Sequence, residues 1–60
     1  MVPESIYKRF VEEFPHMEGQ VLKYYIYRKE PNTIKIWLKN HNKLFFSILD
    51  DGTWHLRTEK

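Results

Sequence analysis

The fold is decided by the stretch Thr33-Ile34-Lys35-Ile36-Trp37-Leu38-Lys39, in which every even-numbered residue is aliphatic. Side chains of a β-strand point alternately to its two faces, so a period of two is typical of a strand with one buried face. Branched and aromatic residues also favour strands. The stretch therefore predicts a strand with an aliphatic face and a second face that carries Trp37 between two lysines.

The same alternation recurs in three further stretches, which together predict four strands over residues 20–29, 33–39, 43–49 and 53–58. Short runs of turn-forming residues separate them: Glu30-Pro31-Asn32, Asn40-His41-Asn42 and Asp50-Asp51-Gly52. These runs predict three hairpins and hence an antiparallel meander. In the last hairpin, Gly52 is free to adopt a positive φ, and a three-residue loop sets Ile48 opposite Trp54.

The N-terminal part of the chain predicts an amphipathic helix over residues 3–14. Its apolar side chains recur at helical spacing, with charged residues on the other side: Ile6, Tyr7, Phe10, Val11 and Phe14. Pro3 suits the first helical position, where its missing N–H costs nothing, and Pro15 ends the helix.

The predicted fold class is α+β, with the N-terminal helix packed on one face of a four-stranded antiparallel meander, and we expect residues 1–60 to form one small domain. The helix stripe of Ile6, Phe10 and Phe14 is the natural cover for the even-numbered face of the sheet. That face comprises Leu22, Tyr24, Ile26, Ile34, Ile36, Leu38, Leu44, Phe46, Ile48, Trp54 and Leu56.

One helix covers only one face, so the odd-numbered side chains are expected to face solvent or a partner. Three-residue loops would place Tyr25, Trp37, Phe45 and Arg57 side by side, with lysines at their flanks. Three rings could expose about 450 Å², at about 150 Å² each, which is comparable with the largest apolar patch of a typical monomer. The predicted binding residues are Tyr25, Tyr27, Lys35, Trp37, Lys39, Phe45, His55 and Arg57.

Three interpretations of this surface are open. It can bind a protein partner or a second copy of the chain, which the modest net charge of +2 favours. Single-stranded DNA or RNA is the alternative, since bases stack on rings while cations meet phosphates. Thirdly, the rings can simply stiffen the sheet. The β-prone segment of residues 22–27 lies in the first strand, an edge of the meander, and also favours self-association.

Catalytic and metal-binding patterns are not evident, so we expect a non-enzymatic module without a cofactor. Glu12 and Glu13 are adjacent on the helix and point about 100° apart, unlike paired catalytic carboxylates. The three histidines are scattered, and there is no cysteine to complete a zinc site. Both glycines lie in predicted turns, which argues against a glycine-rich phosphate loop.

The composition fits a reducing, intracellular environment. It has no cysteine and no apolar run of about 20 residues, so we expect a cytoplasmic protein without a membrane segment. A bias to Lys, Ile, Asn, Tyr and Phe, with no alanine, is compatible with an A+T-rich genome such as those of many phages and mobile elements.

Overall fold

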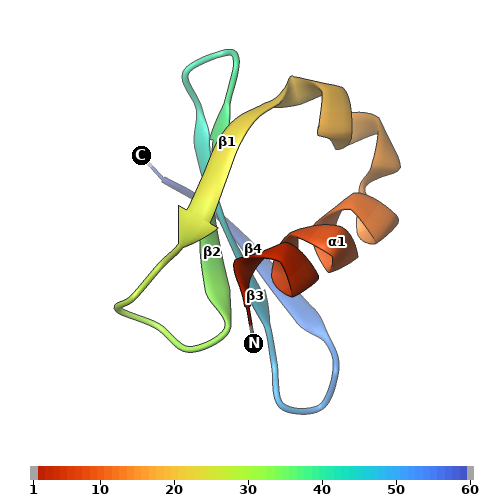
Figure 1. Cartoon of the computed structure of the whole chain (residues 1–60), viewed down its shortest axis with the longest axis vertical. Helices are drawn as coiled ribbons and strands as arrows, with labels where there is room; N and C mark the ends of the chain where they lie inside the picture. Colours follow the sequence, from red (N-terminus) through yellow and green to blue (C-terminus); the bar gives the residue numbers. More distant parts are fainter. Residues whose placement is uncertain (1, 60) are drawn as a thin grey trace.

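The computed structural model describes residues 2–59 and has an α+β fold in which one helix lies on one face of an antiparallel sheet (Figure 1). The sheet order β1-β2-β3-β4 follows the chain, so the predicted meander is confirmed. The elements are α1 (Pro3–Glu13), a 3₁₀ helix η1 (Pro15–Gln20), β1 (Val21–Ile26), β2 (Thr33–Leu38), β3 (Lys43–Ile48) and β4 (Trp54–Glu59).

The helix α1 begins and ends near the predicted positions. Val2 is its N-cap in an extended conformation and Pro3 is its first residue. The chain leaves the helix at Phe14, whose N–H still donates to the Phe10 carbonyl. Pro15 then starts η1, so the segment predicted as a simple turn forms a short 3₁₀ helix that leads into the sheet.

The core lies between α1 and the even-numbered face of the sheet, as predicted. Ile6 and Phe10 of the helix are fully buried, and so are Ile34, Ile36 and Phe46 of the sheet. The rings of Phe10 and Phe46 meet edge to face, with centroids 5.4 Å apart. Burying a large side chain of this kind contributes about 1.5–3 kcal/mol, so these five residues are the main source of docking energy.

Aromatic contacts extend the core to both edge strands. Tyr7 of α1 stacks on Tyr24 of β1, with ring centroids 4.1 Å apart. Burial raises the pKa of the Tyr7 phenol, and the neighbouring Glu18 carboxylate and Tyr24 act in the same direction. At the other edge, Phe14 meets Trp54 of β4 edge to face at 5.0 Å.

The prediction that Leu22 lies in the core is wrong. Val21 pairs with Leu38 and Lys23 pairs with Trp37, so β1 has one extra residue, a β-bulge at Leu22. The bulge interrupts the alternation of side chains. Val21 packs against the core in its place, while Leu22 is 63% exposed.

Two of the predicted hairpin registers are shifted by two residues. Tyr25 pairs with Lys35, and Trp37 pairs with Lys43. The first loop is longer than three residues, since the Tyr27 N–H donates to the Thr33 carbonyl, whereas the second keeps three residues but begins one residue earlier, since the Leu38 N–H donates to the Asn42 carbonyl. Asn32 and His41 adopt positive φ in these loops. In the first loop, Tyr27 follows β1, which ends at Ile26, so the predicted strand over residues 20–29 is too long.

The third hairpin forms as predicted. Gly52 has a φ of 87°, and Ile48 lies opposite Trp54. The Asp51 carboxylate accepts hydrogen bonds from the hydroxyl and the backbone N–H of Thr53 at 2.6 and 3.0 Å. The hydroxyl bond, followed by the backbone bond, lowers the pKa of Asp51, which means that the turn stabilises the ionised carboxylate.

Candidate functional site

The candidate site is the open face of the sheet, defined as the side away from α1. It carries the odd-numbered side chains of β2, β3 and β4, and those of Lys23 and Tyr25 in β1. A two-residue shift of register leaves each side chain on its face but changes its neighbours across the strands. Rings therefore lie beside cations, whereas the prediction aligned ring with ring.

The first row of this face runs from Lys23 through Trp37 to Lys43. The ammonium groups of Lys43 and Lys23 lie 4.3 and 4.8 Å from the centroid of the indole ring. Lys35, from the next row, lies 5.5 Å from the same centroid. Each such contact contributes about 0.5–1 kcal/mol at an exposed site, but the three like charges also repel one another.

Trp37 also holds an unpaired donor. Its Nε1 is buried and has no hydrogen-bond acceptor within the described residues. Leaving such a group without a partner costs about 1–3 kcal/mol.

The second row alternates ring and cation along Tyr25, Lys35, Phe45 and Arg57. Lys35 lies 2.7 Å from the Glu59 carboxylate, and Arg57 pairs with Glu30. Hydrogen bonding between Lys35 and Glu59 raises the pKa of the ammonium and lowers that of the carboxyl group. The cations of this row are thus already neutralised within the chain.

Lys23 and Lys43 differ from Lys35 and Arg57 in this respect. Among residues 2–59, neither Lys23 nor Lys43 has a carboxylate within 4.0 Å. The field of Lys43 does contribute to lowering the pKa of Glu59, whose closer partner is Lys35. Lys23 and Lys43 therefore lie over the Trp37 ring without a direct ion-pair partner, although Glu59 lies opposite Lys43 in β4.

The rings of this face are less exposed than expected. Tyr25 is 42% exposed, whereas Trp37 and Phe45 are only partly exposed. Lysine or arginine side chains lie over both of the latter rings, and Tyr27 packs on Phe45 at 4.7 Å. The face is consequently a cation-covered aromatic surface, and the predicted bare apolar patch of about 450 Å² is absent from the described residues.

Side chains of the open face contribute to two hollows within the described residues. The larger, of about 410 Å³, we call the Trp37 groove, which lies near the loop between β2 and β3. It is lined by Leu22, Lys23, Trp37, Leu38, Lys39, His41 and Lys43. The exposed Leu22 and the Trp37 ring give it an apolar wall, and its three lysines make it basic.

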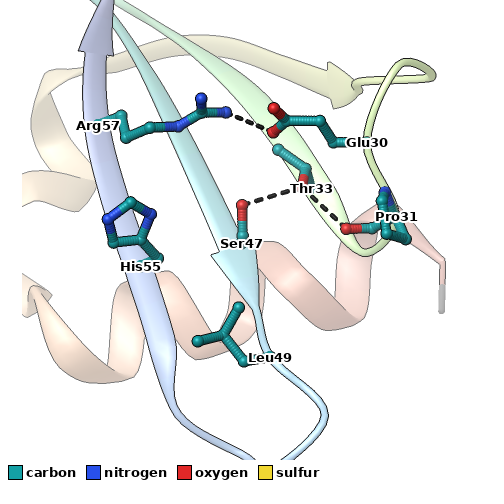
Figure 2. A pocket seen from close by; sticks show the side chains of 7 residues that line it. All are labelled: Glu30, Pro31, Thr33, Ser47, Leu49, His55 and Arg57. Atoms are coloured by element: carbon teal, nitrogen blue, oxygen red, sulfur yellow. Dashed lines mark hydrogen bonds and ion pairs between the residues drawn. The ribbon is translucent and has the colours of Figure 1, made fainter.

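The second hollow, of about 290 Å³, lies at the opposite end of the sheet and is lined by Glu30, Pro31, Thr33, Ser47, Leu49, His55 and Arg57 (Figure 2). Its floor is a buried pair of hydroxyl groups, Thr33 and Ser47, 2.9 Å apart. Thr33 donates its proton to the Pro31 carbonyl, so Ser47 donates to Thr33. The Arg57–Glu30 ion pair spans the hollow. The charged groups of this pair and the two hydroxyl groups therefore have their partners within the chain.

The eight predicted binding residues thus divide into three groups. Trp37 and Lys39 line the Trp37 groove; His55 and Arg57 line the second hollow; Tyr25, Lys35, Phe45 and Tyr27 lie between them. The predicted set lacks the groove residues Leu22, Lys23, Leu38, His41 and Lys43. Lys23 and Lys43 are odd-numbered, so the alternation of side chains already predicts them on the open face, beside the predicted set. The bulge that exposes Leu22 cannot be predicted from that alternation.

Clusters of metal-binding type and membrane-spanning helices are both absent from the described part of the chain. No three His, Asp or Glu side chains of residues 2–59 gather in a way that could hold a metal ion. Within the same range, no helix has the length and apolar character needed to cross a bilayer. Comparisons of the chain with protein-family models, curated proteins and solved structures found no match.

Proposed function

We propose that this chain is a non-enzymatic binding module that holds an anionic macromolecule on the open face of its sheet. The observation that carries the proposal is the set of unpaired lysines around Trp37, in a groove of about 410 Å³. Elsewhere on the face, Lys35 and Arg57 have carboxylate partners. Charge complementarity raises both association rate and selectivity, so a negatively charged partner fits this groove best.

The same charges disfavour one form of self-association. In a symmetric dimer, the same patch on both copies meets. A dimer formed through the Trp37 groove would bring Lys23, Lys39 and Lys43 of the two copies together, and juxtaposed like charges cost several kcal/mol. A symmetric dimer through this groove therefore ranks below an anionic partner.

Neutralising the groove tests the proposal. The Lys23→Gln/Lys43→Gln variant removes two positive charges from it, and Lys8→Gln/Lys29→Gln removes two exposed charges, on α1 and on the loop at the opposite end of the sheet. Polyglutamate, inorganic polyphosphate and oligothymidylate serve as probes in calorimetric titrations at low salt. We expect at least one probe to bind, and the groove variant to bind it more weakly than the control variant. Equal loss in both variants, or no binding of any probe, contradicts the proposal.

A second candidate function is self-association along β1. This strand is at the edge of the sheet, and Leu22 and Tyr25 are 63% and 42% exposed on it. Exposed edge strands pair readily, although the bulge and Lys23 oppose this. If β1 pairs, the mass from light scattering rises with concentration and Leu22→Lys restores the monomer. A monomeric mass at every concentration rules this candidate out.

A further inference from the structure

In the Trp37 groove, cationic and aromatic side chains alternate, and this alternation favours one class of anionic partner over others. Lys23, Trp37 and Lys43 lie in one row across three strands, so a flat aromatic ring is flanked by a cation on either side. Lys39 lines the same groove. An acidic peptide without aromatic residues, such as polyglutamate, would pair with the lysines but has no ring to stack on the indole between them.

We infer that the Trp37 groove binds single-stranded nucleic acid, with a base stacked on Trp37 and the phosphates on either side of it at Lys23, Lys39 and Lys43. The inference rests on the proposed function and narrows the partner to one chemical class. A single strand alternates phosphate and base along its length, which matches the alternation of cation and ring in the groove. A duplex hides its bases within the stack and does not match.

The exchange of the lysines for a base is close to balanced on the ring itself, and the phosphates supply the gain. Each ammonium over the exposed ring contributes about 0.5–1 kcal/mol, and a base stacked on it contributes about 1–3 kcal/mol, which offsets the loss of up to three such contacts. A lysine displaced from the Trp37 ring stays near it on its flexible stem and meets a phosphate. The repulsion among the lysines around the indole is then relieved by the negative charge.

Two other residues extend the site. Tyr25 is exposed, and its ring centroid is 6.5 Å from that of Trp37, so a second base has a neighbouring ring. Leu22, brought to the surface by the bulge, forms part of the apolar wall of the groove. The indole N–H is buried and has no acceptor among residues 2–59, so a base carbonyl or a phosphate oxygen that reaches it would satisfy this donor.

The test compares oligothymidylate of about 12 nucleotides with a duplex of the same length, inorganic polyphosphate and polyglutamate. We expect the single strand to bind most tightly and to quench tryptophan fluorescence. Three phosphate contacts at about 0.7 each give a log–log salt slope of about −2. Trp37→Leu should weaken binding of the single strand by about 5- to 150-fold, which is the value of one stacked base, and leave polyphosphate binding unchanged.

Each alternative result has a defined meaning. If Trp37→Leu lowers the binding of all probes, its circular dichroism spectrum shows whether the variant is folded. Trp37→Phe keeps an aromatic face, so the inference then requires this variant to retain most of the oligonucleotide affinity. If polyphosphate or the duplex binds as tightly as the single strand, or if the fluorescence does not change, the inference is overturned but the proposed function is not. The same holds if polyglutamate binds more tightly than the single strand. Failure of all four probes overturns both.

Discussion

The ammonium group of Lys43 lies 4.3 Å from the centre of the Trp37 ring, directly across the strand pair β2–β3. Trp37 is on the face that α1 leaves uncovered, so the Lys43 side chain, and no second layer of helices or strands, covers part of its ring. The contact explains how a small sheet keeps a large ring on its open face without exposing it fully. It also makes the ring available to any ligand that competes successfully with an ammonium group.

Docking of α1 depends on Phe10. The ring is fully buried and contacts Phe14 and Phe46. Phe10→Ala should destabilise the protein by about 3–5 kcal/mol, because it removes apolar burial and leaves a cavity. Urea unfolding followed by tryptophan fluorescence measures this. Glu12→Ala, at an exposed position of the same helix, should change stability by less than about 0.5 kcal/mol; similar losses in both variants would contradict the docking.

The buried Thr33–Ser47 pair predicts unequal single-variant effects. Thr33 bonds to both Ser47 and the Pro31 carbonyl, whereas Ser47→Ala leaves the bond from Thr33 to Pro31 intact. Thr33→Val should therefore cost more, within about 1–3 kcal/mol, because two partners lose a bond. In a double-variant cycle, the double variant should be more stable than the sum of the single effects predicts. Strict additivity would show that the hydroxyl bond contributes nothing.

The two glycines provide a matched test of the last hairpin. Gly52 has a φ of 87°, a conformation in which a Cβ is strained, so Gly52→Ala should destabilise the protein by about 1–2 kcal/mol. An added Cβ at Gly19 would meet nothing within 4 Å, and the φ there is not positive. Gly19→Ala should therefore be neutral or stabilise by up to about 1 kcal/mol. Thermal unfolding of both variants distinguishes them; equal destabilisation would refute the turn geometry.

The Lys35–Glu59 ion pair predicts a limited pH range of stabilisation. The pKa of Glu59 is lowered from its ordinary 4.5, so the contribution is present above that value and is lost as pH falls through the lower folded-state pKa. The pKa of Lys35 is raised from 10.5, so the contribution is present below that value and is lost as pH rises through the higher folded-state pKa.

Comparison of the natural chain with Glu59→Gln tests this range. The difference in their unfolding free energies should be constant at neutral pH and disappear in acid, as the Glu59 carboxylate becomes protonated. The pair is partly exposed, so the difference should also shrink as salt is added. A difference that persists unchanged in acid would show that Glu59 acts through packing and not through its charge.

The open face shows what the alternation of side chains along a strand predicts and what it does not. Tyr25 and Trp37 are predicted to be direct neighbours, but Lys35 lies opposite Tyr25 and the two rings are diagonal neighbours at 6.5 Å. A slip of two residues keeps side chains on their faces, because the period of a strand is two. Faces are therefore predictable from alternation, whereas cross-strand partners depend on the conformation of each loop.

Loop conformation has its own local causes, which the turn composition indicates only in part. Asn32 and His41 adopt positive φ, and the Asn40 side chain accepts a hydrogen bond from the Asn42 N–H. The first loop is longer than the predicted three residues, and the second has three residues but begins one residue earlier in the chain. In the third loop, Gly52 supplies the positive φ at the expected place, and its register is predicted correctly.

The sequence alone determined the α+β class, most of the helix and the core residues, except that Val21 takes the place of Leu22. These features depend on the period at which apolar side chains recur along the chain. Only the tertiary structure decided which cations surround Trp37, that Leu22 is exposed beside it and that Thr33 and Ser47 are buried. The register set by each loop decides the neighbours of Trp37, the bulge in β1 exposes Leu22, and the hydrogen bond between β2 and β3 joins the buried hydroxyl groups of Thr33 and Ser47.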